Sequence, residues 1–89
     1  QLYELPGAIV YHFDLYRLGD PAELEFIGIR DYFAADSLCL VEWPERGVGA
    51  LPPADLAITI VAAGSSRSVR ARAGSVLGSR VLARWQPGV

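Results

Sequence analysis

Two acidic residues stand where runs of strand-forming residues end. Asp14 follows the apolar run at positions 8–13, and Glu42 follows a second apolar run at positions 38–41. In open α/β sheets, ligands bind outside the carboxyl ends of the strands. Mg²⁺ is commonly held by one or two carboxylates together with phosphate oxygens and water. The sequence therefore predicts that Asp14 and Glu42 are metal-associated residues of an anion-binding site. The alternative is that each is a strand-end acid facing solvent.

Three further residues could serve such a site or fill structural roles. Trp43 follows Glu42 and could stack on a base, although a plug at the end of the sheet is the simpler interpretation. His12 lies two residues before Asp14, on the same face of the strand. It could carry a proton, but a hydrogen-bonded core histidine is more common. Arg67 is expected at the tip of a hairpin, where it could reach an anion or remain ordinary surface.

The elements that would position these residues follow from local patterning. Both acid-bearing runs are apolar on successive positions, as expected of parallel strands buried on both faces. Between them, Asp20 and Pro21 open a helix and Gly28 closes it, which makes a strand–helix–strand crossover with parallel strands. Two alternating segments at 55–62 and 68–73 predict a hairpin. A C-terminal helix is predicted by apolar residues at four-residue spacing, namely Leu77, Val81 and Trp85.

Composition narrows the classes of protein. The 89 residues suffice for one small domain, and 52% are hydrophobic, which predicts a packed core. All eight basic residues are arginine, so the chain contains no lysine for a phosphate-binding G-x-x-x-x-G-K-[ST] loop or for a Schiff base. The net charge of −2 argues against a nucleic-acid surface acting alone. Cys39 has no second cysteine to pair with, which is typical of a reducing cytoplasm, and its apolar neighbours predict a packing role.

Three stretches go beyond a generic α/β pattern. They lie at residues 11–18, with H-F-D-L-Y-R at 12–17, at residues 20–33, and at residues 40–45, with V-E-W-P at 41–44. Together they resemble the TsaE family (formerly YjeE) of bacterial P-loop ATPases, and the resemblance covers nearly all of the chain.

The resemblance implies a fold and an activity. The fold would be three-layer α/β and P-loop NTPase-like, with a mixed sheet of parallel strands followed by an antiparallel hairpin and a C-terminal helix. Residues 1–89 would form the C-terminal part of a single domain. The parent protein would bind and hydrolyse ATP in the cytoplasm. It would act with TsaB and TsaD in the threonylcarbamoyl modification of adenosine 37 in tRNA. It would reach tRNA indirectly, through that complex, with no membrane and no DNA involved.

The resemblance also assigns roles to residues. Glu42 would be the Mg²⁺-associated acid, and Asp14 a second catalytic acid near the metal and phosphates. Trp43 would lie by the nucleotide, ATP or ADP, and Arg67 would contact it from the hairpin.

One departure from the family pattern concerns the loop that binds the phosphates. The family's Walker A loop, with its lysine, should come before residue 1, so we interpret the chain as a segment of a longer protein. Its first five residues would then be the tail of an earlier strand, and ATP binding by the segment alone is not expected.

Two other functions remain open. One is a non-enzymatic module that docks a partner through its arginines (Arg70, Arg72, Arg80 and Arg84). The other is an unrelated metal-dependent phosphohydrolase using Asp14 and Glu42. A haloacid-type phosphatase would need a second aspartate where Tyr16 stands.

Overall fold

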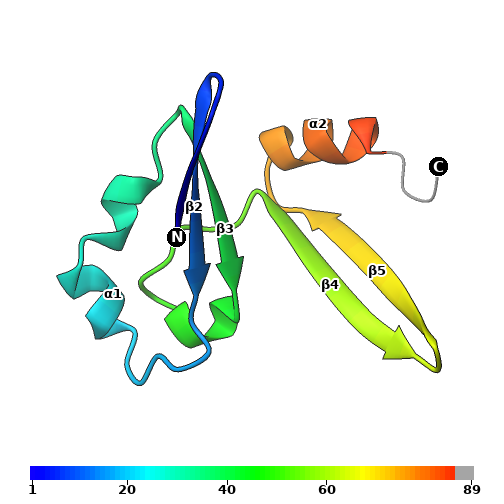
Figure 1. Ribbon diagram of the computed structural model, residues 1–89, viewed down its shortest axis with the longest axis horizontal. Coiled ribbons are helices and arrows are strands. Elements are labelled where there is room, and N and C mark those ends of the chain that lie inside the picture. Colours follow the sequence, from blue (N-terminus) through cyan, green and yellow to red (C-terminus); the bar gives the residue numbers. More distant parts are fainter. Residues whose placement is uncertain (86–89) are drawn as a thin grey trace. The chain divides into compact units, whose positions relative to one another are not determined.

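The computed structural model describes residues 1–85 and divides into two compact units, Gln1–Pro52 and Pro53–Val89, which we describe separately (Figure 1). The first unit contains β1 (Leu2–Leu5), β2 (Ala8–Asp14), α1 (Ala22–Phe26), the 3-10 helix η1 (Ile29–Tyr32), β3 (Ser37–Glu42) and the 3-10 helix η2 (Pro44–Gly47). The second contains β4 (Leu56–Ala63), β5 (Ser66–Ala73) and α2 (Val76–Arg84).

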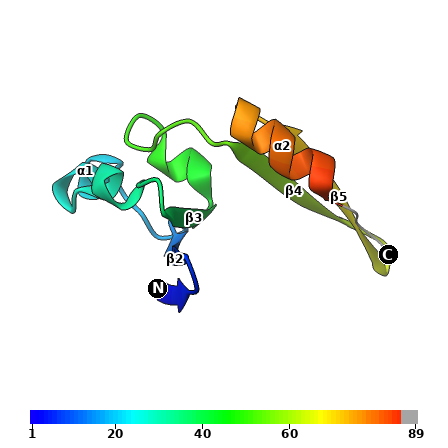
Figure 2. The same cartoon turned by 90° about the horizontal axis from the view of Figure 1, so that it is seen from above.

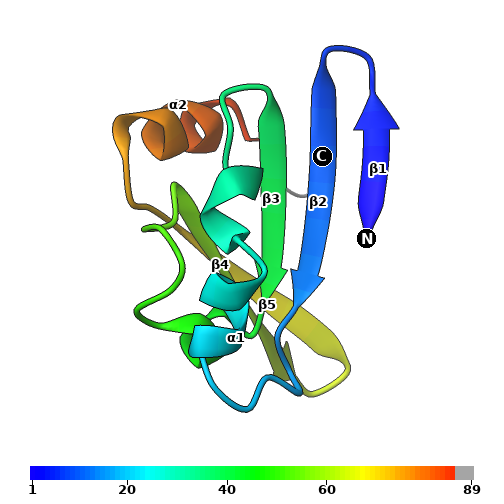
Figure 3. The same ribbon diagram turned by 90° about the vertical axis from the view of Figure 1, so that its left-hand side faces the viewer.

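The first unit is built on a three-stranded sheet with the order β1-β2-β3. β2 and β3 run parallel, as the crossover pattern predicted, and their register ends with Asp14 opposite Glu42. β1 pairs antiparallel with β2 across a turn in which Gly7 has φ 81°. Residues 2–5 thus form β1, which makes a hairpin with β2. The strand end that the sequence predicted at the start of the chain corresponds to β1. Figure 3 shows the three strands side by side, with α1 on one face of the sheet.

The crossover between β2 and β3 begins and ends where the sequence indicated. The Asp20 side chain accepts a hydrogen bond from the Ala22 N–H at 2.9 Å, which satisfies a donor that the first helical turn leaves without a partner. Gly28 adopts the left-handed conformation with φ 70°, which turns the chain so that Ile29 packs back into the core at 1% exposure. The buried cluster comprises Leu15, Leu24, Ile29 and Ala50.

Within the part of the chain that the structure describes, the sheet of the first unit has one packed face and one largely open face. On the open face, Val10 of β2 is nonetheless buried at 7% exposure. Along β3, exposed and half-buried side chains alternate, and Leu38 and Leu40 are 51% and 50% exposed. The prediction of burial on both faces is therefore wrong for β3, whereas the residues of β2 before Asp14 are all half-buried or buried. The apolar run of β3 contains both the face that packs and the face that is open.

The second unit is a two-stranded antiparallel ribbon with a helix against it. β4 and β5 pair from Leu56 opposite Ala73 to Ala63 opposite Ser66, and Gly64 in the connecting turn has φ 63°. The hairpin and the C-terminal helix are confirmed, and the chain is a mixed α/β protein with small sheets. Within the described residues β4 and β5 form a two-stranded sheet, so a mixed sheet that continues into this hairpin stays a prediction.

Helix α2 contacts the ribbon (Figure 2), and its least exposed residues are not the ones that the apolar spacing indicated. Gly78 is buried and Leu82 half-buried, whereas Leu77 and Val81 are 57% and 49% exposed. The Ser75 hydroxyl caps the helix by accepting a hydrogen bond from the Gly78 N–H at 3.0 Å. Among the described residues, no helix has the length and apolar character needed to cross a membrane.

Candidate functional site

The two predicted acids meet at the carboxyl ends of adjacent strands. Asp14 and Glu42 are the last register pair of β2 and β3, and the Leu15 N–H donates to the Glu42 carbonyl at 3.1 Å just beyond them. Residues opposite each other on adjacent strands project to the same face of a sheet. Both acids are exposed, so their carboxylates are open to a ligand at this edge.

His12 makes a direct contact with one of the acids. Its Nε2 lies 3.2 Å from Oε2 of Glu42, and its Nδ1 lies 3.5 Å from Oε1 of Gln1. Its side chain is 30% exposed, so the expected hydrogen-bonded histidine is confirmed as half-buried rather than as a core residue. Its alternation with Asp14 was visible in the sequence. The sequence did not show that Glu42 is the partner of His12, because that contact depends on the register between two strands.

Asp14 is oriented by its own backbone. Its Oδ1 accepts a hydrogen bond from the Tyr16 N–H at 3.1 Å, a local turn in which an aspartate side chain binds the backbone two residues on. Among residues 1–85, Oδ2 has no hydrogen-bond partner. The turn therefore fixes the carboxylate while leaving one oxygen to face a ligand.

An aromatic and cationic cluster lies beside the acids, and sequence reasoning missed it. The rings of Tyr16 and Trp43 are 5.0 Å apart at their centroids and tilted by 56°. The guanidinium carbon of Arg46 lies 5.5 Å from the Tyr16 ring centroid. Trp43 is 47% exposed, so it does not fill a closed position at the end of the sheet. The available signal was that Tyr16 and Trp43 each follow a strand-end acid.

The donor set limits what the site can hold by itself. Within the described part of the chain, no three residues of the types His, Cys, Asp and Glu are grouped closely enough to hold a metal ion. Two carboxylates suit a hard cation such as Mg²⁺, which takes its other ligands from water and phosphate. The arrangement therefore fits a metal shared with a bound phosphate better than a metal enclosed by protein.

Arg67 belongs to the second unit. It lies near the start of β5, is exposed, and its Nη1 donates to the Ser66 carbonyl at 3.2 Å. Asp14 and Glu42 belong to the first unit, so a contact between Arg67 and a nucleotide held by these acids stays a prediction.

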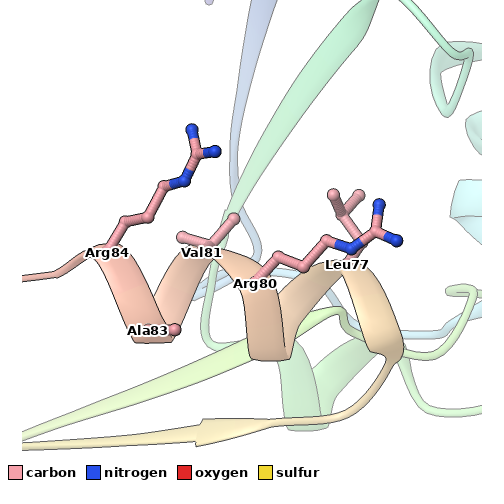
Figure 4. Close-up of a pocket in the computed structure, with 5 residues that line it drawn as sticks. All are labelled: Leu77, Arg80, Val81, Ala83 and Arg84. Atoms are coloured by element: carbon pink, nitrogen blue, oxygen red, sulfur yellow. The ribbon is translucent and has the colours of Figure 1, made fainter.

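The hollow drawn in Figure 4 also belongs to the second unit and contains no acid. It has a volume of about 510 Å³ and is lined by residues of α2: Leu77, Arg80, Val81, Ala83 and Arg84. With no oxygen ligand among these side chains, it is not a candidate metal site.

Comparison with known proteins places the chain among relatives that share one name. The TsaE family model, described as "Threonylcarbamoyl adenosine biosynthesis protein TsaE", matches residues 1–71. The "tRNA threonylcarbamoyladenosine biosynthesis protein TsaE" of Haemophilus influenzae is 49% identical over 83 residues, which cover 93% of this chain and 52% of that protein. Proteins of the same name from Bacillus subtilis and Rickettsia bellii are 42% and 40% identical over 62% and 51% of the chain. The chain spans about half the length of the Haemophilus protein and about a third of the other two. The family model covers most of the chain, and the chain therefore belongs to the TsaE family.

Proposed function

We propose that the chain supplies the metal-associated half of an ATPase site in a protein of tRNA threonylcarbamoyladenosine biosynthesis. The observation that carries the proposal is the pairing of Asp14 with Glu42 at the carboxyl ends of two parallel strands. The names of the relatives support the pathway. The strand-end position supports the nucleotide site, because this edge is where α/β sheets bind ligands.

Each residue of the site has a role in this proposal. Glu42 holds Mg²⁺, and His12 orients its carboxylate from 3.2 Å away. Asp14, fixed by its turn, is the second acid near the metal and phosphates. Trp43 and Tyr16 form a wall beside the nucleotide. Bound Mg²⁺ would neutralise phosphate charge, which the two carboxylates would otherwise repel.

The phosphate grip must come from elsewhere in the protein. The chain has no lysine, and backbone N–H groups of a Walker A loop usually supply most of the contacts to phosphate. We propose that this loop lies in the portion of the family's length that the chain does not span. TsaB and TsaD would be the partners of the whole protein in the cytoplasm, tRNA would be reached through them, and Arg67 would contact the nucleotide.

The test is a fluorescence titration of Trp43 with Mg·ADP in a Trp85→Phe background, so that a single indole reports. It compares the 89-residue chain with a chimera in which the Walker A segment of the Haemophilus relative is joined before residue 1. We expect no saturable change in the chain and a saturable change at roughly micromolar nucleotide in the chimera, which corresponds to a binding free energy of about −8 kcal/mol.

Controls separate the roles of the acids. In the chimera, Glu42→Gln and Asp14→Asn should each weaken the Mg²⁺ dependence of binding, whereas Asp36→Asn, an exposed acid before β3, should not. Saturable binding by the 89-residue chain would mean that the phosphate grip is local and that the acids are misassigned. Mg²⁺-dependent hydrolysis of an aryl phosphate by that chain would instead favour an unrelated phosphohydrolase.

A further inference from the structure

Charge is divided unevenly between the two units. Residues 53–89 carry five arginines and one aspartate, a net charge of +4, whereas residues 1–52 carry three arginines and nine carboxylates, a net charge of −6. The chain's overall charge of −2 is therefore the sum of two units with net charges of opposite sign. The second unit is therefore basic, although the chain as a whole is acidic.

The arginines of the second unit form no ion pair among the described residues. Its one acid, Asp55, accepts a hydrogen bond from the Ser75 hydroxyl at 2.6 Å. Across residues 1–85 the one ion pair within 4.0 Å joins His12 to Glu42, so none of the five guanidinium groups has a carboxylate partner there. All five arginines are exposed. Unpaired, solvated guanidinium groups are available to an anionic ligand.

Two of these arginines share one face of the ribbon. In the register, Arg70 lies opposite Thr59 and Arg72 opposite Ala57, and alternate residues of a strand project to the same side. The other face carries Leu56 and lies under α2, which reaches it through residues that line a common hollow (Leu56, Ile58, Val81, Leu82, Arg84 and Trp85). We call the face opposite α2 the basic ribbon face; its members are Ala57, Thr59, Val61, Ala63, Ser66, Ser68, Arg70 and Arg72.

We propose that the basic ribbon face binds the phosphodiester backbone of a nucleic acid. Guanidinium groups form charge-assisted hydrogen bonds to phosphate, and the hydroxyls of Thr59 and Ser68 add neutral donors of the kind that contact backbone oxygens. Val61 is the largest apolar side chain on the face, and there is no aromatic residue. A protein partner would lack an aromatic or large apolar anchor there, and bases would lack a stacking surface. The binding is therefore electrostatic and independent of base sequence.

This inference does not depend on the proposed nucleotide site, because it concerns the other unit. The test is fluorescence anisotropy of the whole chain with a labelled RNA oligonucleotide of mixed sequence, and with DNA of the same sequence. For two phosphate contacts, affinity should fall by about sevenfold as salt rises from about 50 to about 200 mM. The affinities for RNA and for DNA should agree within a few-fold, since the proposed contacts are to the phosphodiester backbone.

A matched pair of double variants assigns the binding to one face. Arg70→Ser with Arg72→Ser should weaken binding about tenfold and lower the salt slope by about 1.4, as expected for two lost phosphate contacts. Arg80→Ser with Arg84→Ser removes the same charge from α2, which packs on the other face of the ribbon, and should change affinity by no more than about twofold because salt screens charges that do not contact the ligand. Circular dichroism should show both variants folded.

Three results would overturn the inference. Equal losses in the two double variants would mean that charge acts diffusely and that the face has no special role. Equal affinity for a polyglutamate peptide would mean that an acidic protein suits the arginines as well as a nucleic acid does. Absence of binding even at low salt would exclude the site.

Discussion

Trp43 combines an uncommon backbone conformation with a position directly after a strand-end acid. Its φ of 58° lies in the left-handed region, where, of the described residues, every other member is a glycine. Holding an aromatic residue there costs about 1–2 kcal/mol and needs compensation from its surroundings. The contact with Tyr16 supplies part of that compensation. That contact places the indole of Trp43 beside Tyr16, two residues after Asp14.

Gly28 has the same conformation without a side chain, and its replacement is a direct test of the turn. Gly28→Ala should destabilise the chain by about 1–2 kcal/mol, because alanine resists a positive φ. The added Cβ would also lie 3.2 Å from Oδ2 of Asp31, and Ile29 behind the turn is buried. Urea unfolding followed by circular dichroism measures the loss.

Gly19→Ala is the control for that variant. Gly19 does not have a positive φ, and a Cβ there would meet nothing closer than Oε1 of Glu23 at 3.7 Å. Its unfolding free energy should match the wild type within about 0.5 kcal/mol. Equal losses in the two variants would show that the conformation of Gly28 is not what matters.

Cys39 should react slowly with alkylating reagents. Burial raises the pKa of the Cys39 thiol above its usual value, and the hydrogen bond with Ser37 offsets part of that rise. The thiolate is the reactive form, so the alkylation rate should increase with pH through a midpoint higher than that of a free cysteine. Iodoacetamide kinetics on the folded chain and on the urea-unfolded chain provide the comparison. A lower midpoint in the folded chain would contradict the burial argument.

At the scale of elements, the packing of α2 depends on a glycine. A Cβ added at Gly78 would overlap the backbone carbonyl oxygen of Asp55, which cannot move aside as a flexible side chain can. Glycine to alanine in a helix normally gains about 1 kcal/mol. At this position the overlap should outweigh that gain, because overpacking costs about 1–3 kcal/mol. We therefore expect Gly78→Ala to lower the stability of the second unit.

Fluorescence of Trp85 in a Trp43→Phe background reports unfolding of that unit in urea. Ser79→Ala is the matched variant: it is the next residue of the same helix and is exposed, so the better helix propensity of alanine should leave stability equal or higher. Opposite signs for the two alanines are the expected result. Stabilisation by both would mean that the helix does not pack closely against Asp55.

The helix also shows why some of the architecture could be predicted from the sequence and some could not. Apolar residues at four-residue spacing correctly indicated that a helix forms. They did not indicate its buried face, which contains Gly78 and Leu82, because close backbone approach at a glycine decided the packing. The parallel pairing of β2 with β3 was predictable, since a strand–helix–strand unit leaves few other arrangements.

Some features of the candidate site could likewise be predicted from the sequence and others could not. Asp14 and Glu42 were predictable because each ends a strand. The contact of His12 with Glu42 and the tilted contact of Tyr16 with Trp43 were not, because a shift of one residue in register would have moved every partner to the other face. Local patterns thus identified the acids. The residues that orient and flank them emerged from the pairing of two strands distant in sequence.

At the scale of the whole molecule, buried apolar surface is scarce. The buried hydrophobic residues of the described chain are five: Val10, Leu15, Leu24, Ile29 and Ala50. Many larger apolar side chains are exposed, including Leu38 and Leu40 on the open sheet face. Contiguous exposed apolar surface promotes association. We therefore expect the 89-residue chain to bind the dye ANS and to scatter light as its concentration rises.

Substitution on the open face should separate association from stability. Leu40→Thr keeps a strand-forming residue and removes apolar surface from a side chain that is 50% exposed. It should lower ANS fluorescence, raise the concentration at which scattering begins and change unfolding free energy by less than about 0.5 kcal/mol. Leu24→Thr makes the same chemical change at 3% exposure and should cost about 2–5 kcal/mol, because it leaves a cavity in the core. If Leu40→Thr unfolded the chain as well, the open face would be part of the packed core rather than exposed apolar surface.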